Sequence, residues 1–193
     1  MLPEAPSRPV RHKGFTVIEL MVAVAIVAVL GMLAAPSVRD LMAKNQFSSV
    51  SNEFSGSIMR ARNEAVSRNS CVTMCMSSNM QNDKPTCSTA DNNWQVGWIV
   101  FLNPSCTATD PDGSKPEDLI LARKPASADY LLQSQKNEHA FTFNPQGRPT
   151  PVTSTQFNLA YKSASDPLTG KFGSNICLDG LGKTRSIKAA ENC

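Results

Sequence analysis

The chain has 193 residues, of which 41% are hydrophobic and 18% are charged, and its formal net charge is +3. This composition excludes a disordered tail and a fibrous repeat, and the length suits one ordinary domain with an additional segment. The small net charge also excludes a strong polycation that would bind nucleic acid through charge alone.

An apolar segment of 21 residues lies between Gly14 and Pro36. At about 1.5 Å rise per residue, a helix of this length crosses a hydrocarbon core about 30 Å thick. The range 15–36 is therefore predicted to be a transmembrane helix. Three basic residues and one acid precede it, which places the short leader in the cytoplasm and the remainder outside.

One carboxylate, Glu19, interrupts the apolar segment close to its start. A charged side chain costs roughly 2.5–3.5 kcal/mol at the centre of a bilayer and less near its surface, so it normally has a partner. No basic residue lies within the segment. From the residues alone, the simplest interpretation is that Glu19, one turn into the segment, reaches up to the lipid headgroups.

The helical pattern resumes after Pro36, which is expected to kink the helix rather than end it. Apolar residues recur every three or four positions and form one stripe that should pack on a sheet. The residues of this stripe are Phe47, Val50, Phe54, Ile58, Ala61 and Ala65. The range 37–69 is therefore predicted to be an amphipathic continuation of the same helix.

The apolar period changes to two at Cys71. We expect strands over 71–76 and 94–102 that form a hairpin, and the second is apolar on both faces, as a central strand is. Further strands are expected over 119–123, 130–132, 140–143, 155–161, 175–178 and 184–188. The predicted fold class is α+β, with one long helix on an antiparallel sheet and a β-rich head over 70–193.

Six cysteines occur in this predicted head. An even number in a small exported domain indicates disulfides, although six cysteines allow fifteen connectivities. The pairs that we favour tie down the C-terminal tail, close the hairpin loop and join the hairpin base: Cys177 with Cys193, Cys75 with Cys87, and Cys71 with Cys106.

The run KGFTVIELMVAVAIVAVL resembles the class III signal of type IV pilins and type II secretion pseudopilins. In that family a membrane prepilin peptidase cuts after the glycine, here Gly14, and the new amino terminus, here Phe15, is N-methylated. The resemblance implies that the leader 1–14 is removed. It also implies that Glu19 meets the Phe15 amine of a neighbouring subunit, since paired opposite charges favour one axial register in a filament.

Four later blocks resemble the GspH/FimT type of minor pilin: RARNEAVSRNSCVTMC, WQVGWIVFLNP, FTFNPQGRP and ICLDGLGKTRSIK. The resemblance implies a type IV pilin-like fold and a minor pilin that helps to prime and assemble a type IV pilus. Its partners would be other pilins and minor pilins in a helical filament, prepilin peptidase and the inner-membrane assembly platform. The alternative is a GspH-like minor pseudopilin of a type II secretion system, because both systems use the same signal.

The same resemblance implies a location. The chain would first lie in the bacterial inner membrane as a single-pass protein, with its N-terminus cytoplasmic and its head periplasmic, and then in the pilus at the cell surface.

DNA is a further possible partner. Gly182-Lys183-Thr184-Arg185 is similar to the Gly-Arg-x-Arg motif of FimT-type minor pilins, which are associated with DNA capture in natural transformation. The candidate DNA-binding residues are Lys183, Arg185, Lys188 and Arg148. The alternative is that these charges lie on a solvated edge strand and keep it from aggregating.

No pattern in the sequence indicates catalysis. The two histidines, His12 and His139, lie far apart and form no paired metal motif. The acids between Asp110 and Asp118 lack the spacing of a calcium loop. Cys71 and Cys75 suit disulfides better than zinc, because no second pair follows at zinc-like spacing. We therefore expect no enzymatic activity, no cofactor and no metal.

Overall fold

The computed structural model describes residues 14–80, 84–90, 92–107, 109–113, 115–124, 129–150, 154–163 and 166–193. The chain divides into two compact units, Met1–Leu41 and Met42–Cys193. Of the predicted leader 1–14, only Gly14 belongs to the described residues.

Helix α1 extends from Val17 to Ser67 and ends in a hydrogen-bonded cap. The Ser70 amide donates to the Ala65 carbonyl (3.1 Å) and the Asn69 amide donates to the Val66 carbonyl (3.3 Å). Asn69 is left-handed, with φ 47°. This is the Schellman arrangement, which satisfies the last carbonyls of a helix and turns the chain away from its axis. The chain then enters the first strand.

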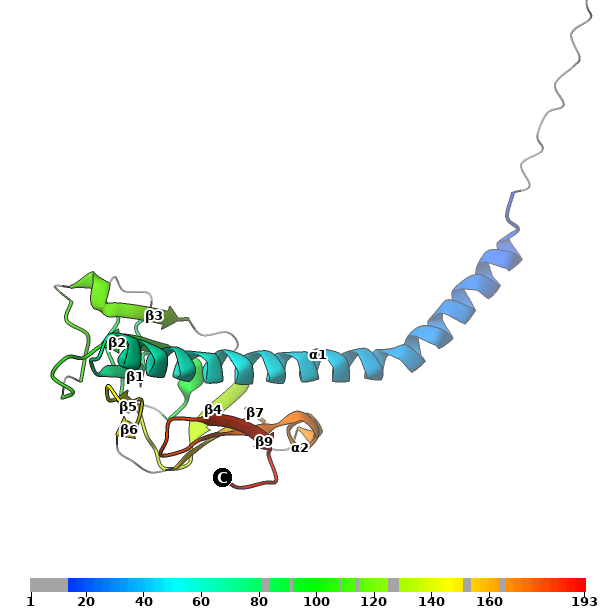
Figure 1. Ribbon diagram of the computed structural model, residues 1–193. Coiled ribbons are helices and arrows are strands. Elements are labelled where there is room, and N and C mark those ends of the chain that lie inside the picture. Colours follow the sequence, from blue (N-terminus) through cyan, green and yellow to red (C-terminus); the bar gives the residue numbers. More distant parts are fainter. Residues whose placement is uncertain are drawn as a thin grey trace, which may run out of the picture. The chain divides into compact units, whose positions relative to one another are not determined.

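The strands form two antiparallel sheets (Figure 1). The first sheet has the order β3-β2-β1-β5-β6. Its strands are β1 Val72–Met76, β2 Trp98–Leu102, β3 Leu119–Arg123, β5 Ala140–Phe143 and β6 Pro149–Thr150. The second sheet has the order β4-β7-β8-β9. Its strands are β4 Tyr130–Ser134, β7 Thr155–Tyr161, β8 Ser174–Leu178 and β9 Thr184–Lys188. A short helix α2, Pro167–Phe172, links β7 to β8.

The α+β fold expected from the sequence is confirmed, and so is the hairpin of β1 and β2. Val72 pairs with Leu102 and Met76 with Trp98. β2 lies between β1 and β3, with its first four residues buried, as its apolar pattern predicts. The expectation of one sheet is wrong, because β4 and β7 to β9 form a sheet of their own.

The start of the predicted strand 94–102 is instead a 3₁₀ turn, η1, over Trp94–Val96. The Asn93 side chain accepts a hydrogen bond from the Gln95 amide (3.1 Å). The Gly97 amide donates to the Trp94 carbonyl (3.2 Å), and Gly97 has φ 126°. These local bonds compete with strand pairing, so β2 begins at Trp98. A second 3₁₀ turn, η2, covers Pro116–Asp118.

Both sheets pack against the part of α1 that belongs to the unit Met42–Cys193 (Figure 1). The stripe residues are all buried, as predicted: Phe47, Val50, Phe54, Ile58, Ala61 and Ala65. Phe54 makes edge-to-face contacts with Trp94, Trp98 and Phe157, so it joins α1 to both sheets. Burial of each large side chain contributes about 1.5–3 kcal/mol, which makes this stripe the main attachment of the helix.

One buried cation adds a polar attachment. Arg123 of β3 donates to Glu53 of α1 and to Gln95, both at 3.1 Å. Its guanidinium group also lies 4.4 Å from the centre of the Trp98 ring. A buried charge is tolerated when it is paired and hydrogen-bonded in this way.

Three disulfides join Cys71 to Cys106, Cys75 to Cys87, and Cys177 to Cys193. These are the pairs favoured from the sequence. The first bridge joins the loop after β2 to the residue just before β1. The second joins the loop after β1 to β1 itself, and the third joins the C-terminus to β8. All three lie in the unit Met42–Cys193.

Candidate functional site

The first turn of α1 combines a helix cap with the isolated carboxylate. The Thr16 hydroxyl accepts a hydrogen bond from the Glu19 amide (3.3 Å), so Thr16 is the N-cap residue. Glu19 is the acid of the first turn. The pattern Thr-x-x-Glu is that of a capping box, which uses an acid at this position to stabilise the start of a helix. Glu19 thus lies at the position where an acid favours the start of a helix, next to the role implied by the resemblance.

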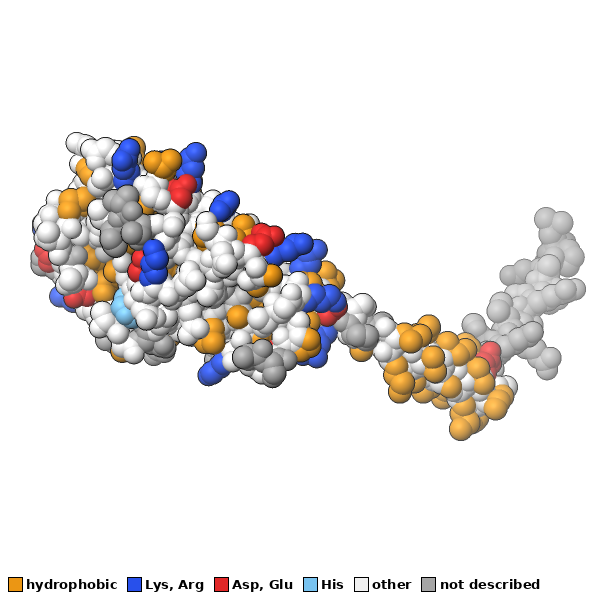
Figure 2. Space-filling model, turned by 90° about the horizontal axis from the view of Figure 1, so that it is seen from below, with side chains coloured by type: hydrophobic (Ala, Val, Ile, Leu, Met, Phe, Trp, Pro, Cys, Tyr) orange, Lys and Arg blue, Asp and Glu red, His pale blue; other side chains and the backbone are white. Residues whose placement is uncertain are grey.

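The first helical segment presents its apolar side chains outward. Every residue from 14 to 33 is exposed, and Phe15 is 87% exposed. Figure 2 shows the resulting apolar surface over this segment. An apolar surface this large marks contact with lipid or with another protein. Within the described residues, no single helix has the length and apolar character of a membrane span. A bent pair, Val17–Leu33 with Ser37–Ser67, meets that criterion by length and composition alone.

The glycine of the candidate DNA motif has a packing role. Gly182 has φ 77°, and a Cβ atom there would collide with the Gly147 carbonyl and lie 2.9 Å from Nε of Arg62. Arg62 of α1 donates a hydrogen bond to the same carbonyl (3.0 Å). Two turns, one from each sheet, therefore meet on α1 at this point. A glycine is required here whether or not DNA binds.

Lys183 and Arg148 follow these two glycines, and both side chains are exposed. The Asp179 carboxylate accepts hydrogen bonds from the amides of Leu181 (2.9 Å) and Lys183 (2.8 Å), which fixes the turn between β8 and β9. The turn chemistry thus brings Arg62, Arg148 and Lys183 into one neighbourhood, together with the acid Asp179.

The other two candidates lie on opposite faces of β9, which is an edge strand. Arg185 pairs with Cys177, and its guanidinium donates to the Cys193 carbonyl (3.3 Å). Ser186 faces the other way and hydrogen-bonds Ser51 of α1 (3.2 Å). Because side chains alternate along a strand, Lys188 shares the face of Ser186. The four candidates therefore do not form one surface.

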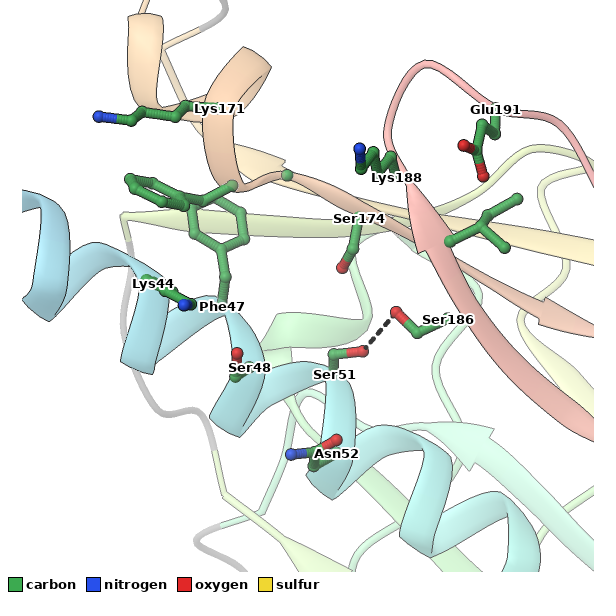
Figure 3. Close-up of a pocket in the computed structure, with 13 residues that line it drawn as sticks. Lys44, Phe47, Ser48, Ser51, Asn52, Lys171, Ser174, Ser186, Lys188 and Glu191 are labelled. Carbon is green, nitrogen blue, oxygen red and sulfur yellow. Dashed lines mark hydrogen bonds between the residues drawn. The ribbon is translucent and has the colours of Figure 1, made fainter.

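Lys188 lines a groove between α1, α2 and β9 (Figure 3). Lys44 and Lys171 line the same groove. The sequence pattern gives no sign of this grouping, because the three lysines come from elements far apart in the chain.

The described residues contain no group of three or more His, Cys, Asp or Glu side chains that could hold a metal ion. The Asp110 carboxylate accepts a hydrogen bond from the Cys87 amide (2.6 Å), and Asp118 is buried. Asp110 therefore joins its own loop to the loop that contains Cys87. Burial raises the pKa of Tyr130, as does its hydrogen bond to Tyr161 (3.1 Å). That pair packs on Phe47 and has a structural role.

The profile of the family described as Type II transport protein GspH matches residues 50–182, more than half of the chain. The chain belongs to the GspH family. A second profile, described as a prokaryotic N-terminal methylation motif, matches residues 10–35. Together these matches imply a membrane-anchored pilin whose family assembles with other pilins in a filament. GspH proteins form a family of structural pilins rather than enzymes.

Two solved structures of the type IV minor pilin FimU from Pseudomonas aeruginosa are similar to this GspH-family chain. One has a TM-score of 0.56 and 17% identity over 77% of this chain and 92% of that one. The other has a TM-score of 0.53 and 16% identity over 75% of this chain and 94% of that one. At this identity the likeness shows the fold alone, which is the type IV pilin-like fold. None of the curated proteins compared with the chain matches it.

Proposed function

We propose that this GspH-family chain is a minor pilin of a type IV pilus, which enters the filament through its first helix and helps to prime assembly through its head. The observation that carries the proposal is the exposed apolar segment 14–33 with its single carboxylate in the first turn. Prepilin peptidase removes residues 1–14, Phe15 is methylated, and the inner-membrane platform moves the subunit into the filament. The N-terminus starts in the cytoplasm and the head in the periplasm, with one span between them.

In this proposal Glu19 pairs with the Phe15 amine of a neighbouring subunit. The chemistry supports it, because Phe15 becomes a charged amino terminus on cleavage and no basic residue lies within the apolar segment. Inside a bundle of apolar helices an unpaired charge is costly, so the pair selects the register in which both charges meet.

Glu19→Ala tests the pairing. Breaking a buried ion pair costs about 3–5 kcal/mol, so we expect the chain in sheared filaments to fall by about tenfold or more. Cleavage of the leader should continue, so the variant should run on an immunoblot at the size of the processed chain. Immunoblots of the filament and membrane fractions make the measurement in the bacterium that carries this chain.

Glu19→Gln is the matched control, because glutamine also serves in a capping box but carries no charge. If the charge is what matters, Glu19→Gln fails as Glu19→Ala does. Normal incorporation of Glu19→Gln would show that the cap, and not the ion pair, is the role of this residue.

The alternative assignment is a GspH-like minor pseudopilin of a type II secretion system, which the family description itself names. Deletion of the chain separates the two. Loss of surface pili with normal protein secretion supports the pilus, and loss of secretion with normal pili supports the secretion system.

DNA binding is a second candidate function, and the grouping of Arg62, Arg148 and Lys183 at the two turns favours it. Three cations and the nearby Asp179 would give weak, salt-dependent contact with phosphates rather than recognition of bases. Arg185 and Lys188 point elsewhere and would contribute less than the sequence motif implies.

A duplex-DNA titration at two salt concentrations tests this candidate, with the detergent-solubilised full chain. Arg148→Ala/Lys183→Ala should abolish binding, and Lys188→Ala should leave it unchanged. Equal loss in both variants would mean general attraction to a cationic protein. Absence of binding by the unaltered chain at low salt would exclude DNA as a partner.

A further inference from the structure

A groove of about 550 Å³ lies on the unit Met42–Cys193, with α1 on one side and α2, β8 and β9 on the other (Figure 3). Three exposed lysines reach it, each from a different element: Lys44 from α1, Lys171 from α2 and Lys188 from β9. Glu191 is the single acid among the residues that line it. The groove therefore carries a net positive charge and attracts an anion.

The wall of the groove also holds a hydrogen-bond donor. The Ser174 hydroxyl is shielded from solvent and has no hydrogen-bond partner. Ser174 pairs with Lys188 across β8 and β9, so the two side chains share the face toward α1. Figure 3 shows the Ser174 hydroxyl pointing into the groove. A shielded hydroxyl without a partner loses hydrogen-bond energy, and a shift of the Ser174 side chain toward the groove would bring its hydroxyl within reach of an incoming oxygen atom.

The lining favours a carboxylate on a protein surface over a phosphate. The groove contains no arginine, the residue whose fork matches phosphate with two hydrogen bonds. Glu191 repels a phosphate, with its higher charge, more strongly than a carboxylate. Phe172 and Ile187, both half-buried, add apolar surface beside the lysines, which suits the mixed surface of another protein.

We propose that this groove, which we call the lysine groove (Lys44, Lys171, Lys188 and Ser174), binds an aspartate or glutamate side chain of a neighbouring pilin subunit in the assembled filament. The inference rests on the proposed function, since it needs a filament in which subunits touch. It adds a contact of the head to the contact that Glu19 makes through the helix.

A carbodiimide crosslink tests the contact directly. This reagent activates a carboxylate, and a lysine amine in contact with it then forms an amide of zero added length. Purified filaments that contain the full processed chain are treated, digested and examined by mass spectrometry. We expect Lys171 or Lys188 joined to an aspartate or glutamate of another subunit. Crosslinks confined to Glu191 of the same chain would overturn the proposal.

Charge reversal gives a second, independent measurement. Lys171→Glu/Lys188→Glu places acids where the neighbour's acid should lie, and like charges at an interface disfavour binding. We expect the chain in sheared filaments to fall by roughly fivefold or more, while leader cleavage and disulfide formation continue. Lys115→Glu/Lys124→Glu changes the net charge equally at exposed positions away from the groove and should be incorporated normally.

The outcomes separate the two proposals. If the unaltered chain never enters filaments, the proposed function fails and the groove contact fails with it. If the unaltered chain enters filaments, and Lys171→Glu/Lys188→Glu is incorporated as well as Lys115→Glu/Lys124→Glu, only the groove contact fails. Binding of the full chain to phosphatidylglycerol vesicles is the remaining measurement. If Lys171→Glu/Lys188→Glu alone loses this binding and is still incorporated normally into filaments, the groove binds phosphate and the proposal is overturned.

Discussion

At the scale of single residues, several positions with conspicuous chemistry turn out to have a local structural role. Glu19 lies where a capping box needs an acid, and Gly182 lies where two turns meet on Arg62. The first role can be read from Thr16-x-x-Glu19 in the sequence. The second cannot, because Gly182 and Gly147 are brought together by two turns from different sheets.

Replacement of Gly97 should cost stability, because both its backbone conformation and its surroundings oppose a side chain. Gly97 has φ 126°, and an added Cβ atom would lie 2.8 Å from the Arg123 carbonyl oxygen and 2.8 Å from Cγ of Met80. We expect Gly97→Ala to lower the free energy of unfolding by about 1–3 kcal/mol. Urea unfolding, followed by the fluorescence of the buried Trp94 and Trp98, makes the measurement.

Gly170→Ala is the control for Gly97→Ala. Gly170 lies in α2 with no atom within 4 Å of an added Cβ. Alanine in a helix is favoured over glycine by roughly 0.5–1 kcal/mol, so this variant should be as stable or slightly more stable. Equal destabilisation of both variants would contradict the argument from φ and contact.

At the scale of elements, the periodicity of apolar residues predicts which face of a helix or strand is buried. It does not predict which strands pair with one another. The stripe from Phe47 to Ala65 is read correctly because helical spacing alone defines it. The division into two sheets is missed, since it depends on which strands pair and not on the pattern within any strand. α2 is missed as well, although Asp166 before Pro167 has the chemistry of a helix start.

The C-terminal disulfide should contribute measurably to the stability of the second sheet. Cys177 and Cys193 are 16 residues apart. A bridge of this length restricts the unfolded chain and is worth about 3 kcal/mol in the chain-entropy treatment. We expect Cys177→Ser/Cys193→Ser to lose about that much free energy of unfolding, measured by urea titration of the full chain in detergent.

The bridge between Cys75 and Cys87 supplies the comparison. It joins residues 12 apart, so its removal should cost a similar or slightly smaller amount. A C-terminal variant that unfolds at the same urea concentration as the unaltered chain would mean that the tail adds nothing to the fold.

At the scale of the whole molecule, the chain consists of two units that meet different surroundings. The described part of Met1–Leu41 exposes apolar side chains, whereas Met42–Cys193 buries its own core. Composition and periodicity predict this contrast well. The lysine groove is beyond such reasoning, because Lys44, Lys171 and Lys188 line one groove only once α1, α2 and β9 are packed.

Gly14→Leu tests whether the chain enters the filament pathway at all. In the proposed pathway a peptidase cuts after Gly14, and a branched side chain at that position should not fit its site. We expect an unprocessed band on a blot of membranes and no chain in sheared filaments. Gly56→Leu, at an exposed position of α1 with open space around it, should be processed normally. Cleavage of the Gly14→Leu chain would contradict the proposed signal.

The three disulfides also set how far the head can stretch under tension. Two closed loops, 71–106 and 177–193, cannot lengthen while their bridges hold, and the loop 75–87 is nested in the first. A fully extended chain spans about 3.3–3.6 Å per residue, and in the unit Met42–Cys193 only the stretches outside these loops, 42–70 and 107–176, can be drawn out to their full length. Tension on the head would thus extend these stretches alone, and chemical reduction of the three bridges would release the loops as well.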